Sequence, residues 1–139
     1  MPNDIRQFFD SYRDAFNRLD GAGVTAHYHV PSMISHAASE GLFSDAESLA
    51  ANNTALCNLY RESGFVRADY VENICLEQGN NFYLADLQWT IQLNDKPAQQ
   101  FNTTYQLARR GASETTSPSW KIEHVTAYSE KRFWKDDAP

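Results

Sequence analysis

The sequence predicts one α+β domain in which three N-terminal helices pack on a strongly curved antiparallel sheet and form a cone. In the first half of the chain, apolar residues recur at three- and four-residue spacing, which is typical of helices with one buried face. From Phe65 onward they recur at every second residue, which is typical of strands. A chain of 139 residues with no internal repeat or linker fits one domain over 1–139, with a core over about 3–130.

The first predicted helix covers 5–19 and carries one apolar stripe. Its members are Ile5, Phe8, Phe9, Tyr12, Ala15, Phe16 and Leu19. Gly21 and Gly23 are expected to end this helix. A short helical turn is predicted over 24–28.

A short strand is predicted over 29–36, and Pro31 indicates that this strand lies at a sheet edge or begins there, because proline has no amide to donate. The third helix begins at a capping box, in which the Ser44 hydroxyl and the Glu47 carboxylate satisfy free backbone amides. Gly64 is expected to end this helix in a left-handed conformation. Its predicted buried stripe consists of Ala46, Leu49, Ala50, Leu56, Cys57 and Tyr60.

Four long strands joined by short turns follow, which predicts an antiparallel meander whose apolar face is covered by the helices. The predicted inner rows are Val66, Ala68, Tyr70 and Ile74, then Tyr83, Ala85, Leu87, Trp89, Ile91 and Leu93, then Phe101, Thr103, Tyr105 and Leu107, and last Trp120, Ile122, His124 and Thr126. The segment 111–119 is predicted to be a polar loop and 130–139 a charged tail.

The charge balance argues against a nucleic-acid partner. The net charge is -6 at pH 7, and the only adjacent basic pairs are Arg109-Arg110 and Lys131-Arg132, whereas phosphate binding needs clustered basic residues. No apolar run approaches the ~20 residues that cross a bilayer, so no membrane partner is expected. The start of the chain does not resemble a signal peptide, and Cys57 and Cys75 are interpreted as reduced, buried, structural residues, which predicts a cytoplasmic protein.

Three stretches of the sequence resemble the nuclear-transport-factor-2-like, or SnoaL-like, superfamily. Phe9-Asp-Ser-Tyr12-Arg-Asp-Ala-Phe-Asn-Arg-Leu19-Asp20 is similar to its first helix. Ala26-His-Tyr28-His29-Val-Pro31 is similar to the entry of its first strand, and Trp120-Lys-Ile122-Glu-His124-Val to its last strand. The resemblance covers nearly the whole chain.

This resemblance implies a mostly apolar internal pocket that takes a small hydrophobic molecule, and a homodimer formed through the outer face of the sheet. The residues expected on that outer face are Asp86, Gln88, Thr90, Gln92, Asn102, Thr104 and Gln106. The residues expected to line the pocket as ligand contacts are Phe16, Tyr28, Met33, Leu87, Trp89, Trp120 and Ile122.

The superfamily includes ketosteroid isomerase, which has a tyrosine on the first helix, a carboxylate base on the first strand and a second acid on a later strand. Tyr12 falls at the first position, His36 falls where the enzyme has aspartate, and Tyr105 falls near the second acid. With His124 as a second candidate base, these residues suit a cofactor-independent isomerase, dehydratase or hydrolase with no metal.

Other interpretations stay open for each candidate. Tyr12 and Tyr105 also suit plain core packing, His124 a structural role and His36 an exposed position. His27 and His29 share one side of a strand at metal-ligand spacing, but the sequence offers no third ligand. Two function classes therefore remain, namely a cofactor-independent enzyme and a non-catalytic ligand-binding or dimerisation module.

Overall fold

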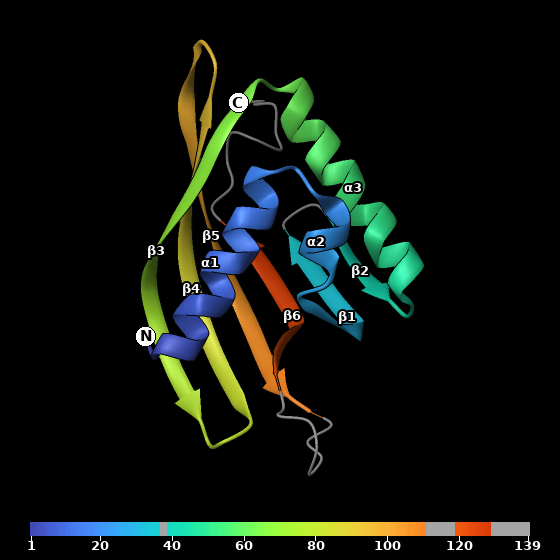
Figure 1. Ribbon diagram of the computed structural model, residues 1–139, viewed down its shortest axis with the longest axis vertical. Coiled ribbons are helices and arrows are strands. Elements are labelled where there is room, and N and C mark those ends of the chain that lie inside the picture. Colours follow the sequence, from blue (N-terminus) through green and yellow to red (C-terminus); the bar gives the residue numbers. More distant parts are fainter. Residues whose placement is uncertain (37–38, 111–118, 129–139) are drawn as a thin grey trace.

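The computed structural model of the chain describes residues 1–36, 39–110 and 119–128 (Figure 1). The helices are α1 (Asn3–Asn17), α2 (Gly21–Thr25) and α3 (Ala46–Glu62), and the strands are β1 (Tyr28–His36), β2 (Ser39–Phe43), β3 (Phe65–Gln78), β4 (Phe82–Leu93), β5 (Lys96–Arg109) and β6 (Trp120–Tyr128). The predicted polar loop, apart from Ser119, and the predicted tail lie outside the described residues.

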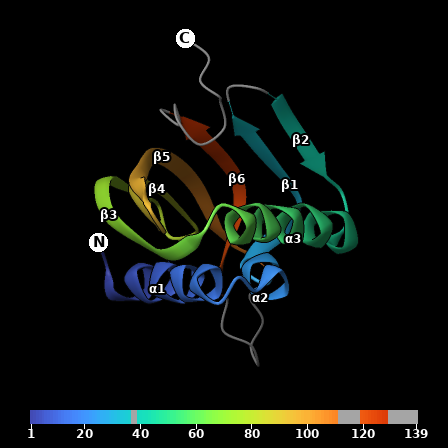
Figure 2. The same cartoon turned by 90° about the horizontal axis from the view of Figure 1, so that it is seen from above.

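The strands form one curved sheet in the order β2-β1-β6-β5-β4-β3. Neighbouring strands are antiparallel, except that β1 runs parallel to β6. Viewed from above, the strands follow an open arc and the helices lie on its inner side, with α1 nearest β3 and α3 in front of β6 and β1 (Figure 2). The predicted α+β fold with a curved, mainly antiparallel sheet is confirmed.

Of the two positions predicted for the first strand, the sheet edge is wrong; β1 itself starts at Tyr28, but its pairing with β2 begins directly after Pro31. The short strand β2, which the sequence analysis does not predict, pairs with β1 on one side, and β6 pairs with it on the other. Pro31 is accommodated because it precedes Ser32, where pairing with β2 begins, and because the register with β6 shifts between Tyr28 and Met33. Proline is tolerated at such an irregularity because no ladder amide is needed there.

The start of α3 differs from the predicted capping box. Asp45 is the N-cap, and its carboxylate accepts a hydrogen bond from the Ser48 amide at 2.8 Å. The cap is therefore one residue later than the Ser44 box implies. Gly64 follows the helix with a φ of 85°, as predicted for its stop.

The two glycines predicted to end the first helix belong to α2 instead. The chain turns at Leu19, which has a φ of 53°, and the Asp20 carboxylate caps α2 by accepting from the Gly23 amide at 3.0 Å. A Cβ atom on Gly21 would lie 2.4 Å from Thr54 Oγ1, so glycine allows α2 and α3 to approach closely.

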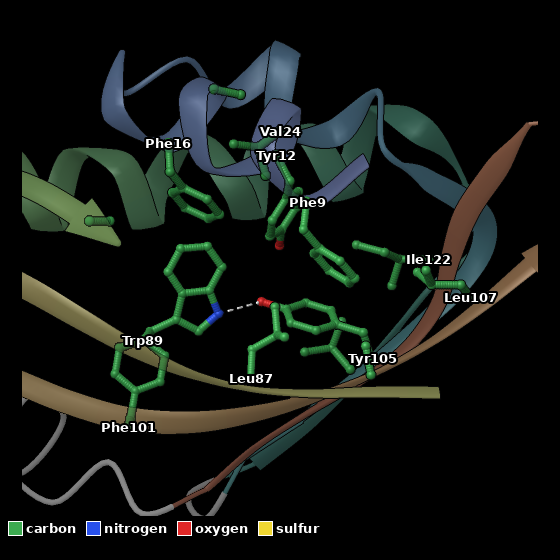
Figure 3. Packing of buried hydrophobic residues seen from close by; sticks show 14 of the residues in the cluster. Phe9, Tyr12, Phe16, Val24, Leu87, Trp89, Phe101, Tyr105, Leu107 and Ile122 are labelled. Carbon is green, nitrogen blue, oxygen red and sulfur yellow. Dashed lines mark hydrogen bonds between the residues drawn. The ribbon is translucent and has the colours of Figure 1, made fainter. Parts of the chain in front are cut away.

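The predicted inner row of β4 is confirmed. Its buried members are Tyr83, Ala85, Leu87, Trp89 and Ile91. They pack with α1 residues such as Phe9 in one hydrophobic core, part of which Figure 3 shows. Alternation along a strand places Asp86 on the opposite face, as predicted.

The predicted inner row of β6 is wrong beyond Ile122. Ile122 pairs with Leu107 but His124 pairs with Gln106, so Glu123 is an extra residue in the strand. Such a bulge reverses the alternation. Val125 is buried, and His124 and Thr126 are exposed on the outer face.

Bulges also change the predicted inner row of β3. Ala68 and Tyr70 face the core as predicted. The register with β4 shifts between Phe65 and Arg67 and between Glu72 and Ile74, so Val66 and Ile74 are exposed and the prediction is wrong for them.

No helix among the described residues is long and apolar enough to cross a membrane. Both cysteines are free thiols, with Cys57 buried and Cys75 half-buried.

Candidate functional site

A cavity of about 380 Å³ lies between the inner face of the sheet and the helices. Its walls come from α1, α3, β1, β2 and the inner rows of β3, β4, β5 and β6. The lining residues are Tyr12, Phe16, Tyr28, Ile34, His36, Glu40, Gly41, Phe43, Asn52, Asn53, Ala55, Leu56, Leu59, Tyr60, Ala68, Trp89, Ile91, Phe101, Thr103, Tyr105, Val125 and Ala127. The lining is mainly apolar and aromatic, with few polar groups, which is typical of small-molecule sites.

Tyr12 and Tyr28 bring two phenol groups into this cavity from α1 and β1. Tyr12 lies on the buried stripe of α1 and is 3% exposed. Its hydroxyl oxygen is 2.7 Å from that of Tyr28, so one of the two donates to the other. The helix and the first strand are therefore joined by a hydrogen bond at the wall of the cavity.

Tyr105 brings a third phenol from β5, and its hydrogen-bond role is fixed by Trp89. The Trp89 Nε1–H donates to the Tyr105 hydroxyl oxygen at 3.0 Å (Figure 3). An indole N–H can only donate, so the Tyr105 oxygen accepts here and its own proton is left to donate elsewhere. In Figure 3 the Tyr12 and Tyr105 hydroxyls point toward the same space.

All three phenols are held in the protonated form. Burial raises the pKa of Tyr28 to about 12. Burial, reinforced by the neighbouring tyrosines, also raises the pKa of Tyr12 and of Tyr105 well above the usual value. The site thus presents neutral O–H donors at physiological pH in surroundings of low dielectric, where a hydrogen bond to a developing negative charge is strong.

His36 lies at the end of β1, half-buried, and lines the cavity. It reaches the cavity because Ile34 and His36 alternate to the inner face of β1. The structure therefore brings together around one cavity three of the four candidate catalytic residues, Tyr12, His36 and Tyr105. His124 is not among them, because the bulge in β6 turns it to the outer face.

Of the candidate ligand contacts, Phe16, Tyr28 and Trp89 line the cavity. The remaining four lie elsewhere. Leu87 and Ile122 are fully buried in the core. Met33 pairs with His124 and so shares the outer face. Trp120 packs against Tyr83, and its Nε1–H donates to Asp4 Oδ2 at 3.0 Å.

Asn53, a buried polar residue of the cavity wall, is not among the residues predicted for the site. Asn53 lies on α3 and is 2% exposed, and its Nδ2 donates to Thr25 Oγ1 at 3.0 Å. It continues the buried positions Leu49, Asn53, Cys57 and Tyr60, which are spaced by four, four and three residues. An amide within this otherwise apolar spacing is the signal that reveals it.

The described residues contain no cluster of three or more metal-ligating side chains. His27 and His29 do not converge on one point. His27 Nδ1 is 2.8 Å from Gly23 O and its Nε2 is 3.0 Å from Ser11 Oγ, whereas His29 Nε2 is 3.4 Å from Ala108 O. Burial lowers the pKa of His27.

Comparisons with known proteins place this architecture in a family. Residues 3–130 match the family model described as NTF2-like protein (DUF6841). The chain belongs to this NTF2-like family. None of the curated proteins matches the sequence significantly.

Several solved structures share the fold of this NTF2-like chain. An NTF-2 like protein of unknown function from Shewanella oneidensis is 17% identical, with 91% of this chain and 98% of that chain covered and a TM-score of 0.72. A ketosteroid isomerase-like protein from Erwinia carotovora atroseptica is 15% identical, with coverage of 90% and 92% and a TM-score of 0.67.

A third structure of this fold, from Thiobacillus denitrificans, is assigned as a calcium/calmodulin-dependent protein kinase type II association domain. It is 12% identical, with coverage of 88% and 92% and a TM-score of 0.70. At these identities the likeness concerns the fold, which includes ketosteroid isomerase-like proteins and hosts other functions as well.

Proposed function

We propose that the cavity binds a small, mostly apolar molecule whose carbonyl oxygen accepts hydrogen bonds from the tyrosine cluster, defined as Tyr12, Tyr28 and Tyr105. The observation that carries this proposal is the meeting of three protonated phenols in one aromatic cavity, of which Tyr12 and Tyr105 are buried and Tyr28 is half-buried. Buried polar groups with a spare donor favour a ligand that supplies the acceptor.

We propose further that His36 takes a proton from the carbon next to that carbonyl. The C–H electron pair then forms the C=C bond of an enolate, and the tyrosine cluster donates to the enolate oxygen. Return of the proton to another carbon would give an isomerase, and loss of a leaving group would give a dehydratase; attack of a His36-activated water would give a hydrolase. This chemistry uses only side chains of the chain.

Binding and exchange measurements on 2-acetylnaphthalene, an apolar aromatic ketone, test both parts of the proposal. We expect saturable binding, and exchange of its methyl protons in D₂O, followed by NMR, faster than in buffer. Tyr105→Phe should weaken binding about tenfold, since the loss of one buried hydrogen bond costs roughly 1.4 kcal/mol. His36→Ala should abolish the exchange while binding persists.

Tyr83→Phe is the matched control, because Tyr83 is a buried phenol outside the cavity. It should leave both readings unchanged. Binding without exchange in the unmodified protein would select the non-catalytic ligand-binding module instead of the enzyme. Absence of any binding would contradict both.

A second function, self-association through the outer sheet face, is favoured by one observation. Val71, Ile74 and Leu76 on the edge strand β3 are 62%, 61% and 53% exposed. Their cross-strand partners on β4 place them on the outer face, where Ile74 lies opposite Asp86. The Asp86 carboxylate accepts hydrogen bonds from Asn73, Thr104 and Tyr128. Exposed apolar side chains beside satisfied polar groups suit a sheet-to-sheet contact between two copies of the chain.

A further inference from the structure

Asn53 adds a group of opposite hydrogen-bond character to the cavity, and its orientation follows from the hydrogen bonds around it. The Thr25 hydroxyl is 2.7 Å from the Gly21 carbonyl, which can only accept, so Thr25 donates there. The Thr25 oxygen is then the acceptor for the neighbouring Asn53 side chain at 3.0 Å. The NH₂ group of Asn53 therefore faces Thr25, and the carbonyl oxygen Oδ1 faces the other way.

The Oδ1 atom is open to the cavity. Asn53 lines the cavity although it is 2% exposed. Among the residues that the structure describes, no hydrogen bond reaches Oδ1. In the part of the chain that the structure describes, the side-chain atoms that are both inaccessible and without a hydrogen bond are Ser32 Oγ and Gln99 Oε1. Asn53 Oδ1 is not one of them, so this unbonded oxygen is accessible. An acceptor that is neither bonded nor sealed, on a residue of the cavity wall, can receive a donor from a ligand.

The cavity thus offers one donor from the Tyr12–Tyr28 pair, a second from Tyr105 on β5, and an acceptor from Asn53 on α3. We infer that its ligand is a hydroxy-ketone, meaning a mostly apolar molecule with a carbonyl for the tyrosine cluster and a hydroxyl that donates to Asn53 Oδ1. This inference rests on the proposed function and narrows its ligand class. Asn53 is then a specificity-determining residue, because a ligand without the hydroxyl leaves a buried amide oxygen unpaired.

Three ketones with the same acetylnaphthalene skeleton test the inference by calorimetric titration. They are 6-acetyl-2-naphthol, its methyl ether 2-acetyl-6-methoxynaphthalene, and 2-acetylnaphthalene. The unmodified protein should bind the naphthol at least tenfold more tightly than the ether, which can accept but cannot donate. Asn53→Leu should reduce this ratio to about one. Asn53→Asp, which keeps an acceptor oxygen, should restore a preference for the naphthol.

Asn58→Leu is the matched control, since Asn58 is an exposed amide on the same helix that accepts from Arg61 and does not line the cavity. It should leave the ratio unchanged. If Asn53→Leu does not fold, Thr25→Val gives the answer, because it removes the hydroxyl that orients the amide and should lower the ratio.

The outcomes separate the two claims. Equal binding of all three ketones by the unmodified protein would overturn the role of Asn53 and leave the proposed carbonyl site standing. A preference for the naphthol that survives Asn53→Leu would also overturn it. Failure of every ketone to bind would overturn the proposed function, and the inference with it.

Discussion

At the scale of single residues, the tyrosine cluster shows why protonated phenols suit this cavity. An ionised phenol is poorly solvated away from water, so burial keeps Tyr12, Tyr28 and Tyr105 neutral. The same burial makes each hydroxyl depend on a partner, which Tyr12 and Tyr28 provide for one another at 2.7 Å.

Tyr12→Phe should therefore lower the free energy of unfolding by about 1 kcal/mol, the usual net contribution of a hydrogen bond. Urea unfolding followed by circular dichroism measures this change. An unchanged midpoint for Tyr12→Phe would show that the Tyr12–Tyr28 bond adds no stability.

The pKa of Tyr28 leads to a pH prediction. The pKa is about 12 in the folded protein and 10.0 for an unperturbed tyrosine. At high pH the unfolded chain loses this proton first, so the contribution of Tyr28 to stability is complete below about pH 10 and is lost as the pH rises toward 12. Unfolding free energies between pH 9 and 12 should fall more steeply for the unmodified protein than for Tyr28→Phe. Parallel curves would contradict the raised pKa.

The position of a candidate residue was predictable from sequence only where the spacing of apolar residues along its helix or strand was regular. Tyr12 lies on a helical stripe and Tyr105 on an unbroken row of β5, and both line the cavity. His124 does not, because Glu123 adds one residue to β6 and no sequence signal marks that bulge. Asn53 was missed because an amide at a core position does not register as apolar.

At the scale of elements, the N-cap of α3 stabilises the helix that forms one wall of the cavity. A carboxylate at the N-cap accepts hydrogen bonds from free backbone amides, and the positive end of the helix dipole attracts its negative charge. The Ser48 amide lowers the pKa of Asp45 through this bond. The sequence indicates the helix and its end at Gly64 correctly, but Ser44 and Asp45 are both good caps and the pattern does not choose between them.

A pair of alanine variants distinguishes the two caps. Asp45→Ala should lower the midpoint of thermal unfolding at pH 7, whereas Ser44→Ala should leave it nearly unchanged. Because the pKa of Asp45 is lower in the folded protein, its contribution is present above the unfolded pKa and is lost as the pH falls through the folded pKa. A larger effect of Ser44→Ala would restore the predicted capping box.

At the scale of the whole molecule, the curved sheet has two unlike faces. The inner face was predictable because most of the alternate residues of β4 and β5 are apolar and must be covered. The exposed apolar residues of β3 were not, because two register shifts move Val66 and Ile74 away from the core. The sequence also gave no signal for β2, a strand of five residues with a glycine at its centre.

Self-association through the outer face predicts a dimer in sedimentation velocity at micromolar concentration. Ile74→Lys should shift the protein toward the monomer, because the charge of a lysine is costly to bury in a sheet-to-sheet contact, even opposite Asp86. Leu42→Lys is the control for position on the outer face, since Leu42 is 63% exposed and shares that face through Met33 but lies on the opposite edge strand, β2; a contact centred on β3 should not respond to it. A monomer at all concentrations, or a dimer indifferent to Ile74→Lys, would argue against this interface.

The carbonyl stretching frequency of bound, ¹³C-labelled 2-acetylnaphthalene tests the role of the tyrosine cluster most directly. Hydrogen bonds from Tyr12 and Tyr105 should lower this infrared frequency below its value in hexane, and Tyr105→Phe should move it back toward that value while Tyr83→Phe leaves it in place. A bound ketone that absorbs in the unmodified protein at its hexane frequency would show that the buried phenols do not touch the ligand oxygen.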